Sequence, residues 1–260
     1  MQKASYDSDL TDQQWQALEP LLPKPKKTGR PPTCRRWVLN AILYVLRTGC
    51  QWSLLPKGFP PKSTVHGILR VWTKHKIIES IHSRLRALAR EAEGRRSRPT
   101  AGVLDSQTSH SAGMAEESGY DAGKKTKGRK RFLLVDTLGF VLAVAVVPAD
   151  VPERVGAKML LEEELSSHSW LKVIYVDGGY SGAAFAEQVA ELKPNLEVEV
   201  VKRTDDQPGF KVVKKRWVVE RTFGWLTKCR RLARDYERLS ETVAAWIHIA
   251  MIRIMLNRLA

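Results

Sequence analysis

The sequence predicts an α/β protein in which an all-α region precedes a domain built on a mixed sheet. Apolar residues recur at helical spacing up to about residue 94, and short apolar strands alternate with helices from residue 100 onward. Two of these strands end in an acid, at Asp105 and Asp177, and a later helix carries Glu220. We therefore divide the chain into a helical region at residues 1–98 and a mixed-sheet domain at residues 99–260.

The charge balance indicates an anionic partner. The 260 residues include 43 Lys and Arg against 28 Asp and Glu, a formal net charge of +15. Such an excess favours a nucleic acid as the partner over a membrane. The longest apolar run, residues 243–256, is shorter than the ~20 residues of a membrane span and contains His248 and Arg253. We expect no membrane association and a location in the cytoplasm.

Cysteine usage and the N-terminus agree with that location. The first ten residues, MQKASYDSDL, contain no apolar signal core. The three cysteines lie far apart without a C-x-x-C pair, which is typical of reduced structural thiols and disfavours a zinc site.

The N-terminal region contains four predicted helices. Thr11 caps the first, which Pro23 closes, and a basic linker follows at 24–32. The second helix spans about 34–47, with Gly49 just beyond its end. A turn-rich stretch leads to a third helix that begins at Lys62, and a fourth spans 77–93.

The third helix is the candidate DNA reader. Its periodicity buries Val65, Ile68, Leu69 and Trp72 and turns four polar or basic side chains outward, Lys62, His66, Arg70 and Lys74. A helix, a turn and a helix with a basic outer face are typical of a helix-turn-helix-like domain. A plain helical bundle gives a similar pattern, so both interpretations stay open from these residues.

From residue 100 the order of elements predicts a ribonuclease-H-like fold. A strand at 101–105 is followed by a Gly-rich loop at 106–131 and by a hairpin of strands 132–135 and 140–147. The remaining elements are a helix at 153–165, a strand at 172–176, a helix at 181–192, a strand at 196–202, the Glu220 helix and a last helix at 241–258. In that fold the two strand acids and the helix acid converge at one end of the sheet.

The Glu220 helix combines a basic surface with one carboxylate. Over residues 211–238, helical spacing predicts one apolar stripe of Val218, Thr222, Trp225, Cys229 and Leu232. The opposite side carries Arg216, Glu220, Thr227, Arg231 and Arg234. Taken alone, this side is equally typical of a solvated helix in which Glu220 pairs with Arg216, four residues away.

Three converging carboxylates imply a metal site. Two bare carboxylates ~4 Å apart repel by about 4 kcal/mol at an effective dielectric near 20, so the cluster Asp105, Asp177 and Glu220 requires a cation. Oxygen ligands select Mg²⁺ or Mn²⁺ rather than zinc. Two such ions, ~3.5–4 Å apart, would support an in-line phosphoryl displacement. Either aspartate alone could simply cap a turn.

Basic side chains near these acids are the candidate phosphate contacts. One group lies in the loop after the first strand, and we expect it to bind DNA: Lys124, Lys125, Lys127, Arg129, Lys130 and Arg131. A second group belongs to the Glu220 segment: Arg216, Arg221, Lys228 and Arg231. A solvated basic loop is the alternative interpretation of the first group.

Several stretches resemble the DDE transposases of bacterial insertion sequences, most closely the insertion-sequence-five type. They are DSQ at 105–107, GYDAGKKTKGRKR at 119–131, LLVDTLG at 133–139, PADVPERVGAK at 148–158, VDGGYSG at 176–182 and RWVVERTFGWLTKCRRLARDYERL at 216–239. LTDQQWQALEPLLP at 10–23 is similar to the helical region at the N-terminus of the same group, so the likeness extends nearly end to end.

The resemblance implies both a catalytic triad and an activity. Asp105, Asp177 and Glu220 would be the triad, with Arg216 as the arginine of the motif around the glutamate. The protein would act as a homodimer that cuts the terminal inverted repeats of its element and joins the 3′ ends to target DNA. The resemblance also implies double-stranded DNA as the partner and a bacterial cytoplasmic location, at the nucleoid. The family motif has Tyr seven residues before the glutamate and Lys seven after it, where this chain has Val213 and Thr227; Lys228 or Arg231 could replace the lysine. An inactive DNA-binding regulator and a general ribonuclease-H-like nuclease are the alternatives.

Overall fold

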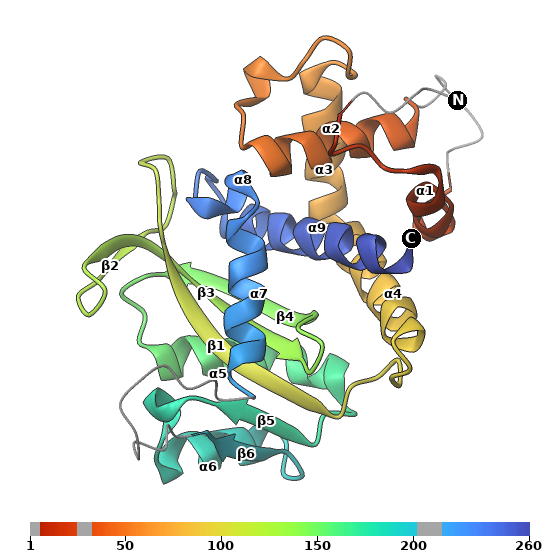
Figure 1. Cartoon of the computed structure of the whole chain (residues 1–260). Coiled ribbons are helices and arrows are strands. Elements are labelled where there is room, and N and C mark those ends of the chain that lie inside the picture. The colour runs from red at the N-terminus through yellow and green to blue at the C-terminus, as the bar shows by residue number, and fades with distance from the viewer. Residues whose placement is uncertain (1–5, 25–32, 202–214) are drawn as a thin grey trace, which may run out of the picture. The chain divides into compact units, whose positions relative to one another are not determined.

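In a computed structural model that describes residues 6–24, 33–201 and 215–260, the chain forms two compact units (Figure 1). The helical unit comprises Met1–Arg95, Leu226–Ala233 and Glu241–Ala260. The sheet unit comprises Arg96–Trp225 and Arg234–Ser240. The change at Arg95 lies near the predicted boundary at residue 98, whereas the C-terminal helix packs in the helical unit and not with the sheet. The linker at 25–32 and Val213 lie outside the described residues.

Hydrogen bonds explain why the C-terminal helix joins the N-terminal residues. The Arg253 guanidinium on α9 (Ser240–Leu259) donates to Gln14 Oε1 at 3.0 Å and to the Asp9 carbonyl at 3.3 Å. Gln14 Nε2 in turn donates to Asn257 Oδ1 at 2.9 Å. These partners are about 240 residues apart in the sequence, so no local pattern could have indicated the pairing.

The predicted helix ends of the helical unit are confirmed. Thr11 caps α1 through a capping box with Gln14, and Gly49 closes α2 in the left-handed conformation with a φ of 67°. The helices of this unit that precede α9 are α1 (Asp12–Leu18), α2 (Arg35–Thr48), α3 (Lys62–Lys74), α4 (Ile77–Ala92) and the short α8 (Arg230–Ala233), with 3₁₀ turns η1 (Glu19–Leu21) and η2 (Trp52–Leu54).

Helix α3 has the two faces that its periodicity predicts. Val65, Leu69 and Trp72 are buried. The polar residues Lys62, His66, Arg70 and Lys74 are all exposed. The connection from α2 to α3 runs through residues 49–61 and includes η2, so it is longer than the 3–4-residue turn of a compact helix-turn-helix.

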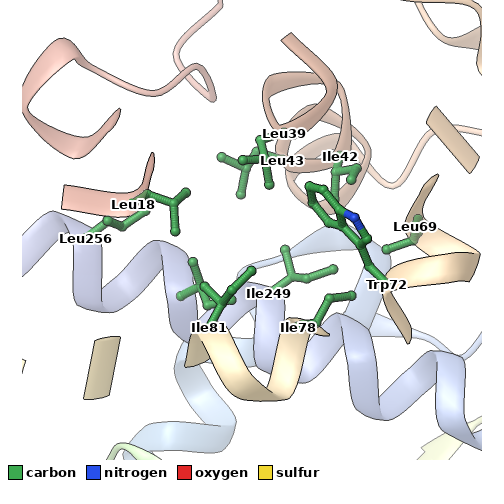
Figure 2. A pocket seen from close by; sticks show the side chains of 11 residues that line it. Leu18, Leu39, Ile42, Leu43, Leu69, Trp72, Ile78, Ile81, Ile249 and Leu256 are labelled. Atoms are coloured by element: carbon green, nitrogen blue, oxygen red, sulfur yellow. The ribbon is translucent and has the colours of Figure 1, made fainter. Parts of the chain in front are cut away.

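An apolar core joins the helices of this unit. Around a small cavity of about 20 Å³, side chains from α1 to α4 and from α9 converge (Figure 2). All the lining side chains are apolar, and the volume is close to that of one water, so the cavity is a packing defect rather than a ligand site. By length and composition α9 could cross a bilayer, but 61% of its apolar window is buried in the protein, as in a core helix.

The sheet unit has the predicted ribonuclease-H-like topology. The sheet runs in the order β2-β3-β1-β5-β6, with β4 on β3; β3 is antiparallel to β1 and β4, whereas β5 is parallel to β1 and β6. Its strands are β1 (Ala101–His110), β2 (Gly119–Asp121), β3 (Thr126–Asp136), β4 (Val141–Pro148), β5 (Val173–Val176) and β6 (Glu197–Val200). Its helices are α5 (Glu153–Glu164), α6 (Ala183–Leu192) and α7 (Trp217–Thr227), with 3₁₀ turns η3 (Leu165–His168) and η4 (Gly178–Tyr180).

The predicted loop at 106–131 is wrong, because most of it is strand. β1 continues to His110 and pairs with a β3 that already begins at Thr126, and β2 adds a third strand to this arm. Gly128 permits the close approach of the two strands, since a Cβ there would lie 2.0 Å from the Ser109 carbonyl oxygen. The arm buries polar side chains that pair with one another, so its sequence lacks the apolar alternation that predicts a strand.

The two faces of the sheet have different coverings. Leu104, Phe132 and Leu134 pack in one core cluster with α5, η3 and α6. Side chains alternate along a strand, so Val103 and Asp105 point to the opposite face, where α7 lies in front of the sheet (Figure 1). This alternation brings Asp105 and the Glu220 helix to the same side.

Helix α7 is shorter than predicted and is rotated from the expected stripe. Its buried residues in the sheet unit are Val219, Thr222 and Phe223, whereas Val218 and Trp225 are half-buried. The Thr222 hydroxyl donates to the Gly139 carbonyl at 2.8 Å, which fixes α7 on the β3–β4 turn. The helix ends at Thr227, so Arg231 and Arg234 do not continue the face of Glu220 as predicted.

Stability of the helical unit should fall on acidification because His248 is buried. Burial, and then the positive charge of Arg86, lower the pKa of His248 to about 4. Below pH 6.5, near the ordinary histidine pKa, His248 is protonated in the unfolded chain but stays neutral in the folded chain until about pH 4. The free energy of unfolding should therefore drop between pH 6.5 and pH 4, by about 3 kcal/mol in total.

Urea unfolding at a series of pH values measures this loss. The variant His248→Gln should flatten the pH dependence, whereas His66→Gln, on the exposed face of α3, should keep that of the wild type. An unchanged pH dependence in His248→Gln would contradict the assignment.

Candidate active site

The parallel pairing of β1 and β5 brings two aspartates to the same level. Val103 pairs with Tyr175, and the same offset of 72 residues places Asp105 opposite Asp177, two residues beyond the last paired residues. Neighbouring strands lie about 4.8 Å apart, so the two carboxylates extend from adjacent positions at the carboxyl end of β5. The sequence predicted this convergence, and the register explains it.

Arg216 connects the second aspartate to the helix acid. One guanidinium nitrogen, Nη2, lies 3.8 Å from Asp177 Oδ2 and 3.6 Å from Glu220 Oε1. The predicted pair between Arg216 and Glu220 is therefore present, and Asp177 shares it. Asp177 also caps a turn, because its Oδ1 accepts from the Gly179 amide at 2.9 Å. The turn-capping interpretation of this residue is confirmed, and its place in a catalytic cluster stays a prediction.

Among the three acids of the predicted triad, Asp105 is the one whose pKa is clearly shifted. Burial is the largest cause that raises its pKa to about 6, and the negative charges of Asp177 and Glu153 add to it. The Ser106 amide, which donates to Asp105 Oδ1 at 2.7 Å, and the Arg216 charge act in the opposite direction. A raised pKa at a buried acid among other acids is typical of a functional site.

A fourth acid, Glu153, belongs to this cluster and was missed in the sequence. It is the first residue of α5, and its Oε1 accepts from the Ser106 hydroxyl and from Lys124 Nζ, both at 3.2 Å. Its Oε2 would lie 3.3 Å from a Cβ placed on Gly179. In the sequence Glu153 looks like an ordinary first-turn acid of a helix; only the motif PADVPERVGAK drew attention to its surroundings.

Arg154 and Tyr180 hold the turn that carries Asp177. The Arg154 guanidinium donates to the carbonyls of Gly179, at 3.0 Å, and Ser181, at 2.6 Å. Tyr180 is 1% exposed, and its hydroxyl interacts with the Ser106 side chain. Burial, with the charges of Glu153 and the two aspartates, raises the pKa of this phenol, so it stays protonated and remains a donor.

The donor set suits a hard divalent cation, although the acids are not gathered around one point. Asp105, Asp177, Glu153 and Glu220 offer only carboxylate oxygens. Across the described ranges, no three His, Cys, Asp or Glu side chains lie as close together as a metal ion requires. The cations of Arg216 and Lys124 lie beside these acids instead.

Three residues of the predicted phosphate-binding loop are structural, which corrects the prediction. Arg129, Lys130 and Arg131 are 0%, 6% and 1% exposed. Arg129 pairs with Asp235 at 3.3 Å and donates to the carbonyls of Glu117, Glu237 and Arg238. Lys130 Nζ donates to the Val151 carbonyl at 2.8 Å. Buried cations that already have partners cannot bind DNA phosphates.

Among the other predicted phosphate contacts, the lysines are exposed and the two arginines are partly or fully buried. Lys124, Lys125 and Lys127 are exposed around the β2–β3 turn, and Lys228 is exposed after α7. Arg221 is half-buried; its guanidinium stacks 4.7 Å from the Trp217 and Trp225 rings and donates to the Leu138 carbonyl at 2.9 Å. Arg231 is 8% exposed and lies over the Trp246 ring, so it is not a phosphate contact and does not replace the lysine of the motif.

Comparison with protein families now places this chain. A family model described as a transposase DDE domain matches residues 96–255, more than half of the 260 residues. The chain therefore belongs to the family of transposases with a DDE domain, as the resemblance predicted. A second model, described as a putative transposase of the IS4/5 family, matches residues 10–82.

Two relatives come from one insertion element of Burkholderia cepacia. The insertion element IS402 uncharacterized 16.2 kDa protein is 36% identical over 91 residues, which are 32% of this chain and 62% of that protein. The putative transposase for insertion sequence element IS402 is 28% identical over 139 residues, 51% of this chain and 64% of that protein. Each match thus spans less than two thirds of the relative.

Among solved structures, a mutant nuclease domain of the large terminase subunit gp2 of bacterial virus Sf6 matches with a TM-score of 0.30. The sequences are 12% identical, and the match covers 63% of this chain and 76% of that chain. A likeness at this level has no bearing on function.

Breaking the buried pair of Arg129 and Asp235 should strongly destabilise the sheet unit. Both side chains are 0% exposed, so Arg129→Met leaves a buried carboxylate without its cation, at a cost of about 3–5 kcal/mol. Urea unfolding measures the change. The exposed Arg238, which lies three residues after Asp235 and pairs with Glu116, provides a control: Arg238→Met should cost no more than about 1 kcal/mol. Equal losses in the two variants would refute the structural role of Arg129.

Proposed function

We propose that this protein is a DNA transposase that binds the terminal inverted repeats of its element and catalyses metal-dependent strand cleavage and strand transfer. The observation that supports this most is the grouping of Asp105, Asp177 and Glu220 on one side of the sheet, in a chain of the transposase DDE-domain family. These three acids are the proposed catalytic residues.

The acids would hold Mg²⁺ or Mn²⁺, two ions by the usual arrangement for phosphoryl displacement. When bound, such ions activate the attacking oxygen and stabilise the leaving 3′ oxygen. The two aspartates share a level of the sheet and Glu220 approaches from α7 through Arg216. Because Arg216 contacts two of the acids, it compensates their repulsion in the absence of the ions and remains available to a phosphate.

DNA recognition would belong to the helical unit. The exposed side of α3 presents Lys62, Arg70 and Lys74 within one helix of 13 residues. A cationic helix face of this length can enter a major groove or lie along phosphates. Two element ends must be processed together, so we propose a homodimer in the DNA complex, with element ends and target DNA as the partners.

A second function, an inactive DNA-binding regulator of the element, is favoured by one observation. Thr227 occupies the position of the motif's lysine. Of the two basic residues that could replace that lysine, Arg231 is buried, which leaves only the exposed Lys228. A regulator would need the DNA-binding face but not the acids. A general nuclease would need the acids but no element ends, so substrate choice separates all three functions.

Replacing one proposed catalytic acid should abolish cleavage without weakening DNA binding. Asp105→Asn, Asp177→Asn and Glu220→Gln each remove a carboxylate that would hold the metal ions, which should cost about 10²- to 10³-fold or more in cleavage rate. Nicking of a labelled terminal-repeat duplex with Mg²⁺ measures the rate, and a gel-shift assay measures binding. Glu162→Gln, on α5 and paired with Lys158, is the control acid.

The wild type then discriminates among the functions. Tight binding with no cleavage would leave the regulator, and equal digestion of unrelated DNA without strand joining would leave the nuclease. Full activity in any one acid variant would remove that residue from the site.

Neutralising the exposed side of α3 should reduce the salt dependence of DNA binding. Each lost phosphate contact lowers the slope of log K against log salt by about 0.9, so the triple variant Lys62→Gln, Arg70→Gln, Lys74→Gln should lose up to about 3 in slope. Fluorescence anisotropy of labelled DNA, measured from about 50 to about 200 mM salt, gives that slope. Lys158→Gln with Lys172→Gln, in the sheet unit, provides the control. An unchanged slope in the triple variant would exclude α3 from the DNA interface.

A further inference from the structure

We propose that the arm of the sheet beyond Asp105 is a binding surface for single-stranded DNA, on which Tyr120 and Tyr236 stack against unpaired bases. The arm comprises β2, the adjoining ends of β1 and β3, and the return segment, residues 234–238, all of which belong to the sheet unit. The inference rests on the proposed function for the choice of DNA as the ligand, and its test needs neither a metal ion nor cleavage.

Two tyrosines leave their rings uncovered on this arm. Tyr120 lies on β2, the outermost strand of the arm, and is 56% exposed (Figure 1). Tyr236 lies in the return segment and is 45% exposed. A tyrosine ring carries a large apolar surface, which is favourable to cover and which can stack on the flat face of a base. Exposed aromatic rings on a sheet are one of the ways in which proteins hold unpaired nucleotides.

The ring of Tyr120 is on the same face of the sheet as Asp105. Tyr120 lies directly opposite Lys127 in the antiparallel pairing of β2 with β3, and the side chains of such partners share a face. Along β3 the residues Lys127, Arg129 and Leu133 share this face because side chains alternate. Leu133 is the partner of Asp105 on β1, so Asp105 shares it as well.

The buried residue next to Tyr120 confirms this orientation. Asp121 is 8% exposed, accepts from the Thr108 hydroxyl at 2.7 Å and lies 3.6 Å from Lys130 Nζ. Lys130 also donates to the Val151 carbonyl, just before α5, so this polar network lies on the α5 side of the sheet. Alternation along β2 then directs Tyr120 to the other side, into solvent.

The return segment that carries Tyr236 is fixed on the same face by Arg129. The Arg129 guanidinium donates to the Arg238 carbonyl and pairs with Asp235 at 3.3 Å. Asp235 also forms a parallel bridge with Ser111, directly after β1. From β2 to the return segment the arm spans three strand spacings, roughly 14 Å in all. That width is within a single-strand site of roughly 4–16 nucleotides.

Exposed cations accompany the two rings. Lys127 is the cross-strand partner of Tyr120, and Arg234 lies two residues before Tyr236. Among the residues that the structure describes, no carboxylate pairs with either cation, and Arg234 Nη2 lies 3.3 Å from His110 Nδ1. Cations beside aromatic rings hold the phosphates and stack the bases of one strand. A duplex keeps the faces of its bases covered, so this combination favours a single strand.

In the proposed function, the arm lies beside the reaction. β1 continues from Asp105 to His110, which is about 17 Å at roughly 3.3 Å per residue. A strand that leaves its duplex near Asp105 therefore reaches the rings within a few nucleotides. The arm would keep that strand from pairing again while the other strand remains at the acids.

Binding of the full-length protein to a fluorescent oligothymidylate of about 20 nucleotides, measured by anisotropy without divalent ions, tests this surface. Oligothymidylate forms no stable pairs with itself, so it reports single-strand binding alone. Tyr120→Ala and Tyr236→Ala should each weaken binding about five- to a hundredfold, the loss of one stacked base. Tyr120→Phe and Tyr236→Phe keep the ring and should restore binding to within about twofold of the wild type. Met159→Ala, at an exposed apolar residue of α5, is the control and should change nothing.

A duplex of the same oligothymidylate with oligoadenylate gives the comparison. Because α3 is the proposed contact for duplex DNA, the tyrosine variants should bind this duplex within about twofold of the wild type. Replacing thymine by iodouracil in the single strand adds a direct readout, since irradiation crosslinks this base to aromatic side chains that stack on it. Mass spectrometry should then find the crosslinks at Tyr120 and Tyr236.

Unchanged single-strand affinity in both alanine variants would overturn the proposal. Equal losses for single strand and duplex, or a loss that phenylalanine does not restore, would overturn it too, because stacking would not be the cause. Should Tyr120→Ala disturb the fold by circular dichroism, Tyr120→Thr places a β-branched residue on β2, and the same loss is expected. If the wild type binds neither single strand nor duplex, the proposed function fails; if it binds and cuts duplex while the alanine variants bind single strands normally, only this inference fails.

Discussion

The parallel pairing between β1 and β5 is the constraint on which the proposed site depends. It sets Asp105 and Asp177 at one level, where β5 ends and the backbone opens into the Gly178-Gly179 turn. Like charges at such a spacing repel, so the surrounding structure must compensate them. Arg216 does so from the α7 side, and the Ser106 amide does so from within β1. The remaining features of the site follow from how this repulsion is balanced.

The basic character of the chain serves two different purposes. Some cations are surface groups available to DNA, as on α3, whereas Arg129 and Lys130 replace apolar residues in the interior of the β1–β3 arm. There Arg129 forms an ion pair with Asp235 and donates hydrogen bonds to the backbone carbonyls of Glu237 and Arg238. A net charge of +15 therefore overstates the surface that is free to bind phosphate.

The sequence predicted the topology because it follows local patterns of apolar runs and helical spacing. It also placed Asp177 directly after a strand and Glu220 on a helix, whereas Asp105 lies within β1 rather than at its end. It failed where partners are distant. The arm at 106–131 looked like a loop because its polar residues pair across strands, and Glu153 looked like a helix-capping acid until β1 and the 177–179 turn were placed beside it. The membership of α9 in the helical unit depends on Gln14 and Asp9, far away in sequence.

That last arrangement has a consequence for biosynthesis. In the sequence the sheet unit lies between the N-terminal helices and α9, so α9 is synthesised after the sheet unit. In the nascent chain, α1 to α4 expose to solvent the apolar surface that α9 later covers. This exposure lasts while more than a hundred residues of the sheet unit are synthesised and fold. A translation product that stops before residue 240 would keep that surface exposed and become a substrate for chaperones and proteases. Premature termination after the sheet unit therefore also prevents the helical unit from completing its core.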